Sequence, residues 1–202
     1  MIALLALACS QSTPPPPPHA PLAVVTPGTW NAADFPLLHG QEVLAICGKR
    51  LERQKLQIES KGDAVVPSVS CNWQVLFGGI EKRVGDGPIV VGTVDGDRSM
   101  APPVTVKVGF ADARIHGRAD SDKRYSVVVR ASDRFVLAEV ENEPEVGPTL
   151  VWAGDLDNDH AVDWVIDTPA RRNASHLRLY LTAKQPDGRP EEVAASRLTR
   201  KP

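Results

Sequence analysis

The residues of this 202-residue chain best suited to chemistry are four aspartates in the stretch 154–167, GDLDNDHAVDWVID. They take positions 1, 3, 5 and 9 of a loop: Asp155, Asp157, Asp159 and Asp163. Hard cations such as Ca²⁺ take six to eight oxygen ligands, and alternating carboxylates on a tight loop can converge on one ion. Without an ion these carboxylates would repel one another. The spacing therefore predicts a cation site.

Two neighbouring residues fit such a loop. Ala161, at position 7, would contribute its backbone carbonyl, and Asn158 tolerates a left-handed backbone. An EF-hand does not fit, because it needs glycine at position 6, where His160 stands, and glutamate at position 12, where Ile166 stands. The sequence therefore disfavours an EF-hand.

The stretch 154–167 instead resembles the calcium loop of FG-GAP/VCBS-type repeats, written G-D-x-D-G-D-G-x-x-D and followed by an apolar strand. The segment from Leu150 to Leu181 is also similar to the C-terminal part of uncharacterised secreted bacterial proteins that carry one such loop. The resemblance implies a structural Ca²⁺ that orders backbone and does not activate water. Its implied ligands are the side chains of Asp155, Asp157, Asp159 and Asp163 and the carbonyl of Ala161.

One substitution departs from this pattern, because His160 replaces the usual glycine and must accept the φ angle that the loop imposes. One copy of the loop also cannot build the propeller that these repeats form elsewhere. The alternative is a degenerate copy that binds no ion. It would be kept as an acidic turn whose Trp164, Val165 and Ile166 still pack in the core.

The first nine residues form an apolar run that ends in Cys9. The run is too short to span a membrane and is typical of the apolar core of a signal peptide. Residues 6–9, Ala-Leu-Ala-Cys, resemble the lipobox of bacterial lipoproteins, which implies that Cys9 is lipidated and becomes the first residue. Two features depart from that pattern: no Lys or Arg precedes the run, and the preferred Leu stands one place early, at Leu5. The alternatives are an ordinary cleaved signal peptide and a buried N-terminal strand.

Five consecutive prolines follow Cys9, and they favour an extended spacer. Proline lacks the N–H group and fixes φ, so such a segment forms a polyproline II rod of about 3 Å per residue. We therefore expect a signal peptide over residues 1–8, a proline-rich tether over 9–21 and a β-rich domain over 22–202. Ser10 directly after the cysteine implies outer-membrane sorting if the organism is Gram-negative.

With Cys9 lipidated or removed, Cys47 and Cys71 remain as an even pair in an oxidising export compartment. The sequence predicts a disulfide between them. Two separate buried thiols are the alternative, because free cysteine behaves as a small apolar residue.

Short apolar runs, separated by Gly, Pro, Asp and Asn, predict an all-β fold of about ten strands. We expect a single β-sandwich or a partly closed barrel. The segment from Ala131 to Arg134 predicts a hairpin turn. The expected strands are Glu42–Cys47, Lys55–Glu59, Ser70–Phe77, Ile89–Val94, Val104–Phe110, Tyr125–Arg130, Phe135–Glu141, Thr149–Ala153, Asp163–Asp167 and Leu177–Thr182.

Other classes of function find little support. A formal net charge of -2 argues against a nucleic-acid partner. The histidines show no zinc-site spacing, and no G-x-S-x-G elbow, P-loop or dinucleotide motif is present. Of the four tryptophans, three lie in apolar strand-like context, which favours the core over a sugar-stacking platform.

The sequence therefore predicts a lipid-anchored, exported envelope protein of structural or interaction type, not an enzyme. Its expected partners are the membrane, through the anchor, and an envelope protein or a glycan. The alternative is a small exported carbohydrate-binding or hydrolytic domain.

Overall fold

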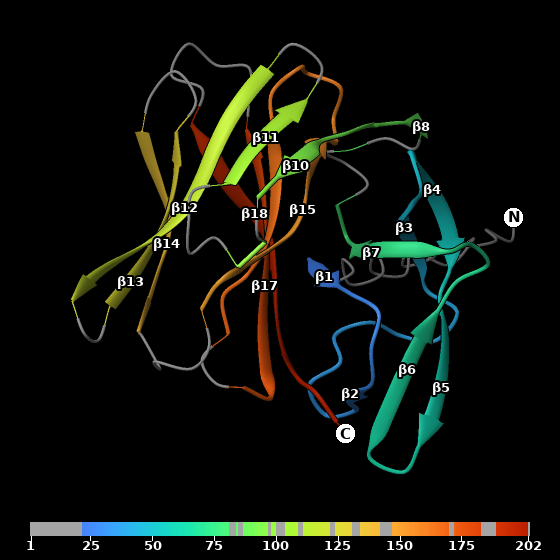
Figure 1. The fold of residues 1–202 in the computed structure, drawn as a ribbon. Helices are drawn as coiled ribbons and strands as arrows, with labels where there is room; N and C mark the ends of the chain where they lie inside the picture. Colours follow the sequence, from blue (N-terminus) through green and yellow to red (C-terminus); the bar gives the residue numbers. More distant parts are fainter. Residues whose placement is uncertain are drawn as a thin grey trace, which may run out of the picture.

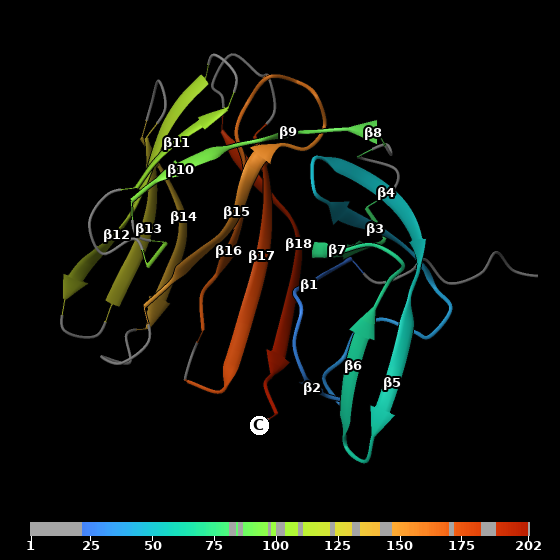
Figure 2. The ribbon, with the colours of Figure 1, turned by 45° about the vertical axis from the view of Figure 1, so that its right-hand side comes forward.

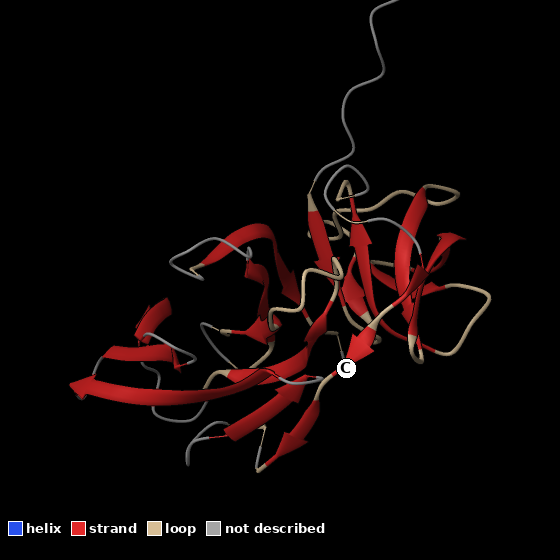
Figure 3. Cartoon of the chain, turned by 90° about the horizontal axis from the view of Figure 1, so that it is seen from above, coloured by secondary structure: helices blue, strands red, loops and turns tan. Residues whose placement is uncertain are grey.

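The computed structural model describes residues 22–80, 84, 87–96, 98–99, 104–108, 111–121, 124–130, 134–141, 147–169, 172–182 and 189–201. Throughout this part of the chain the secondary structure is strand, turn and bend, without a helix (Figure 3). The expected all-β fold is confirmed. The expected signal peptide, tether and lipidated Cys9 lie outside the described residues.

The described strands are mostly short. In chain order they are β1 (Ala23–Val25), β2 (Trp30–Asn31), β3 (Glu42–Cys47), β4 (Arg50–Lys55), β5 (Gln57–Lys61), β6 (Ala64–Ser68), β7 (Trp73–Gly78), β8 (Gly87–Pro88), β9 (Val90–Val91), β10 (Thr93–Asp95), β11 (Val104–Val108), β12 (Ala111–Ser121), β13 (Arg124–Arg130), β14 (Arg134–Glu141), β15 (Thr149–Asp155), β16 (Asp163–Asp167), β17 (Ala174–Thr182) and β18 (Pro190–Thr199).

These strands form four antiparallel sheets, three of which stack as layers. The N-terminal sheet has the order β1-β7-β3-β4-β8, the central sheet β18-β17-β16-β15-β9 and the outer sheet β10-β11-β12-β13-β14. A small sheet, β2-β6-β5, lies beside the N-terminal sheet. Figures 1 and 2 show the central sheet, in orange and red, between the blue-to-teal N-terminal sheet and the yellow-green outer sheet.

Two hydrophobic cores separate the three layers, and the central sheet contributes to both. Leu177, Leu179 and Leu181 of β17 pack in the core shared with the N-terminal sheet. Trp164 and Ile166 of β16 pack in the core shared with the outer sheet. Because both faces of the central sheet are covered, β16 is buried along its whole length. The fold is therefore a sandwich of three layers, and the described strands do not close into a barrel.

Some strand predictions were accurate, whereas β1 and β6, which also have short apolar runs, were not expected. The bounds of β3 and β16 are as expected, and β13 pairs with β14 antiparallel as the hairpin signal predicts, although turn residues 131–133 lie outside the described part. The expected strand Ile89–Val94 is divided instead. Gly92 separates β9, in the central sheet, from β10, in the outer sheet, because the chain crosses between layers at this point.

The predicted disulfide is present: Cys47, at the end of β3, is bonded to Cys71, just before β7, with 5.9 Å between the Cα atoms. It fastens two neighbouring strands of the N-terminal sheet. In the chain-entropy model, closing a loop of this size stabilises the fold by about 3 kcal/mol. Within the described residues, the structure offers no helix that is long and apolar enough to span a membrane.

Candidate metal centre

The acidic loop joins β15 to β16 at the end of the central sheet. Gly154 and Asp163 are ladder partners, so the pairing of the two strands closes the loop at its base. Asp155 is the last residue of β15 and Asp163 is the first residue of β16. The loop is therefore supported by two buried strands, and its ends are fixed.

Three of the four predicted aspartates converge. Asp155, Asp157 and Asp159 each offer a carboxylate oxygen, and the three oxygens lie within 4.8 Å of one another. Asp155 is buried, with 1% of its surface exposed, whereas the other two are partly buried. This arrangement matches the first three side-chain ligands expected from the spacing.

Asp163 is not gathered into this group of three. It is fully buried, and its two carboxylate oxygens accept hydrogen bonds from the backbone N–H of Leu156 at 2.7 Å and of Thr182 at 2.9 Å. Asp163 therefore ties the loop to the neighbouring strand β17. A carboxylate has about four lone-pair sites, so these two bonds leave it able to accept a further contact.

The backbone of the loop wraps around its own carboxylates. The N–H groups of Asp159 and His160 donate to Asp155, at 3.1 and 3.0 Å, and the N–H of Ala161 donates to Asp159 at 2.8 Å. Asn158 and His160 have φ angles of 61° and 71°. The left-handed backbone expected at Asn158 is thus present, and His160 adopts the conformation that a glycine at its position would reach freely.

The electrostatics of the loop disfavour negative charge in the absence of a cation. Burial, followed by the charge of Asp159, raises the pKa of Asp157 from 3.8 to about 6. Burial also raises the pKa of Asp163 well above its usual range, although the hydrogen bonds from Thr182 and Leu156 oppose this shift. A bound divalent cation would reverse both effects by stabilising the ionised carboxylates.

Sequence reasoning did not identify Thr182 as a part of this centre. Besides its N–H bond to Asp163, its hydroxyl donates to the carbonyl of Val162 at 2.6 Å. Thr182 is 20 residues from Val162 along the chain and reaches it through the pairing of β16 with β17. No local pattern in the sequence predicts the contact between Thr182 and Val162.

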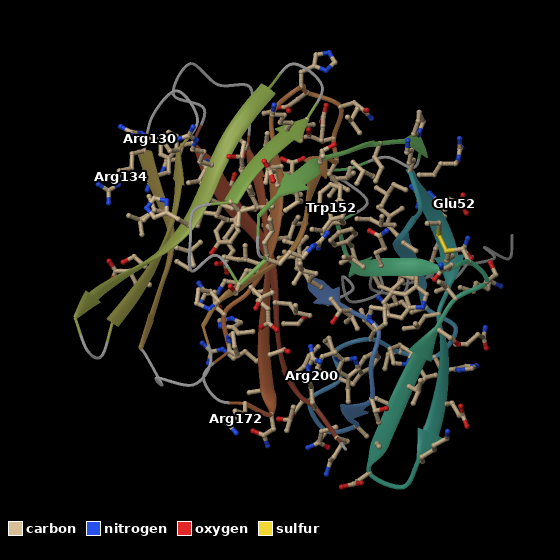
Figure 4. The ribbon with its side chains drawn as sticks, viewed as in Figure 1. Glu52, Arg130, Arg134, Trp152, Arg172 and Arg200 are labelled. Carbon is tan, nitrogen blue, oxygen red and sulfur yellow. A yellow bond between two sulfur atoms is a disulfide. The ribbon has the colours of Figure 1, made fainter. Side chains whose placement is uncertain are left out.

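The tryptophans do not form an exposed platform. Of the three tryptophans in strand-like context, Trp152 and Trp164 are buried, as expected, and Trp73 is partly buried. Trp30, which lay outside the expected strands, is also buried. Figure 4 shows Trp152 between the central and N-terminal sheets. Among the described residues, the tryptophans therefore belong to the cores.

Comparison of the chain with protein-family models, with curated proteins and with solved structures found no match. The assignment of the centre therefore rests on its own geometry.

Proposed function

We propose that this chain is an exported, lipid-anchored envelope protein of structural or interaction type, and that its β15–β16 loop holds one structural Ca²⁺. The observation that carries the metal proposal is the convergence of Asp155, Asp157 and Asp159 within 4.8 Å. Oxygen ligands at this density suit a hard divalent cation. The carbonyl of Ala161 and Asp163 complete the proposed ligand set.

A structural role fits the position of the loop better than a catalytic one. The loop connects two central strands, and through Asp163 it also holds the backbone of β17. An ion there would fix the spacing of three strands that contribute to both cores. The ion would thereby stabilise all three layers together.

Thermal unfolding of the full-length chain, in a non-ionic detergent, tests the metal proposal. Calcium at one hundred times the dissociation constant should stabilise the wild type over an EDTA-treated sample by about 2.7 kcal/mol. For a chain of this size that corresponds to a rise of roughly 5 to 10 °C in Tm. Asp157→Asn combined with Asp159→Asn should abolish the rise, because amide oxygens keep the local hydrogen bonds but lack the charge.

The matched control removes two carboxylates elsewhere, through Asp34→Asn and Glu59→Gln, both exposed and far from the loop in sequence. This variant should keep the full calcium response. A wild type whose Tm is the same with calcium and with EDTA would refute the metal proposal.

A hydrolytic domain is less well supported. One surface pocket formed by described residues has a volume of about 540 Å³, and its lining includes one carboxylate, that of Glu192. This group is already within hydrogen-bonding distance of Tyr180 and Arg178. Most glycoside hydrolases use a pair of carboxylates, one on each side of the scissile bond. The described residues therefore favour a binding role over a hydrolytic one.

A further inference from the structure

Three arginines form a row across the outer sheet. The register places Arg114 of β12 directly opposite Arg130 of β13, and Arg130 directly opposite Arg134 of β14. All three side chains are exposed. Figure 4 shows Arg130 and Arg134 next to each other on the outer side of β13 and β14. We call Arg114, Arg130 and Arg134 the arginine row.

Taken on their own, the three guanidinium groups of the arginine row repel one another. Neighbouring strands lie about 4.8 Å apart, and like charges directly opposite one another on a sheet are destabilising. Within the described part of the chain, none of the three guanidinium groups has an ion-pair partner. The row continues through Thr105 to Asp95, so one carboxylate stands two strands beyond Arg114. A ligand with several negative charges would offset the remaining repulsion.

A pocket opens at the end of the row. Arg134 belongs to both features, because it lines the pocket of about 540 Å³ together with Phe135, Val136 and Leu137 of β14. The facing side of the pocket includes Tyr180 of β17 and Arg189. Both β14 and β18 are edge strands of their sheets, so the pocket lies where the outer and central sheets meet at an open edge.

The chemistry of the pocket suits a sugar ring, which has apolar faces and polar edges. Phe135 and Val136 supply apolar surface, and 54% of Val136 is exposed. The Tyr180 hydroxyl lies 2.9 Å from the carbonyl oxygen of Leu137 and 3.1 Å from the carboxylate of Glu192. Because Arg178 is 3.3 Å from that carboxylate, its negative charge is offset. Pockets of roughly 300 to 1,000 Å³ are the usual size for small ligands.

We propose that the arginine row and this pocket bind a linear acidic glycan. Its carboxylate groups would pair with the guanidinium groups of Arg114, Arg130 and Arg134, and its terminal sugar would enter the pocket. Planar guanidinium groups bind carboxylates through two parallel hydrogen bonds, which gives both energy and orientation.

Other polyanions fit the row less well. An extended acidic peptide could offer carboxylates to the row, but it lacks the sugar ring with apolar faces and polar edges that the pocket suits. Surfaces that recognise anionic lipids usually gather four to eight basic residues, more than the three in this row. Nucleic-acid binders are generally basic, whereas this chain has a net charge of -2.

The glycan site is separate from the acidic loop, and the two proposals can fail independently. The test measures binding of a fluorescent oligogalacturonate to the full-length chain in non-ionic detergent, by anisotropy. A maltooligosaccharide of equal length is the neutral comparison. The wild type should bind the acidic probe with an affinity that falls as NaCl rises, and it should bind the neutral probe far more weakly.

Substitutions in the arginine row should weaken binding without harming the fold. Arg130→Gln should lower the affinity for oligogalacturonate by about tenfold, since a hydrogen bond to a charged group contributes on this scale. Its Tm should equal or exceed that of the wild type, because the substitution relieves like-charge repulsion. The matched control is Arg50→Gln on β4, which removes one exposed arginine from the N-terminal sheet and should leave the affinity unchanged.

Three results would overturn the proposal. The first is an Arg130→Gln affinity equal to that of the wild type. The second is equal affinity for the acidic and neutral probes. The third is binding of the wild type to phosphatidylglycerol vesicles, lost in Arg130→Gln, without binding of oligogalacturonate. Asp157→Asn with Asp159→Asn should bind the probe normally, which separates this site from the calcium proposal.

Discussion

His160 holds a left-handed backbone conformation, which glycine adopts without strain and most other residues adopt only at a cost. Its φ angle is 71°, and the left-handed region costs an L-residue roughly 1 to 2 kcal/mol. The imidazole contributes little in return. The side chain is 82% exposed, and its Nδ1 lies 3.6 Å from Oδ2 of Asp155. At 3.6 Å this contact is too long for a hydrogen bond, so it does little to offset the strain. The loop therefore carries strain at one residue.

His160→Gly should relieve that strain. We expect the free energy of unfolding in EDTA to rise by about 1 kcal/mol, because the relieved strain exceeds the extra entropy that glycine gives the unfolded chain. Chemical denaturation of both proteins measures the difference. Asn158→Gly is the matched control and should gain less, since the short polar side chain of asparagine can hydrogen-bond locally in this region. A His160→Gly variant less stable than the wild type would contradict the strain argument.

At the scale of elements, the convergence of the loop aspartates could be predicted from the sequence. The hydrogen bond that ties the loop to β17 could not. Asp155, Asp157 and Asp159 are close in sequence, so their spacing alone predicts that they converge. The bond of Asp163 to Thr182 crosses 19 residues and depends on which strand lies beside β16. The long strand β12 was also missed. Its residues facing the core include Ala113 and Gly117, which give too weak an apolar signal.

The junction of β9, β15 and the loop depends on Gly154. A Cβ atom at this position would clash with the carbonyl oxygen of Val90 in β9 and with the ring of Trp152. Gly154→Ala should therefore lower the free energy of unfolding by about 2 kcal/mol, because neither a paired backbone nor a buried ring can move aside cheaply. Denaturant titration measures the loss. Gly147→Ala, where a Cβ would meet nothing within 4 Å, should be close to neutral. Equal stability of Gly154→Ala and the wild type would show that the junction adapts.

At the scale of the whole molecule, the third layer of the sandwich could not be predicted from the sequence. The apolar run Trp164-Val165-Ile166 is compatible with a strand buried on both faces, but it does not indicate which sheets cover that strand. The disulfide was predictable because only two cysteines remain after Cys9. The arginine row could not be predicted from the sequence, because it depends on the register of three strands.

The proposed anchor is a property of the whole chain and is tested in cells. In a native-like bacterial host, the wild type should incorporate labelled palmitate and fractionate with membranes. Cys9→Ser should lose the label and release the protein, because the thiol is the only acylation site in the proposed lipobox. Cys47→Ser with Cys71→Ser is the control and should keep the label. Unlabelled, soluble wild-type protein in the periplasm would refute the anchor.

The two ends of the described chain are fastened to each other. The N–H of Val24 in β1 donates to the hydroxyl of Ser196 in β18 at 2.9 Å, and the N–H of Lys201 donates to the carbonyl of Thr29 at 3.0 Å. Arg200 also lies over the ring of Trp30, 5.2 Å from its centre. The first described strand also pairs with β7, so its contacts with β18 are the part of its surroundings that forms only after the last described strand has been synthesised.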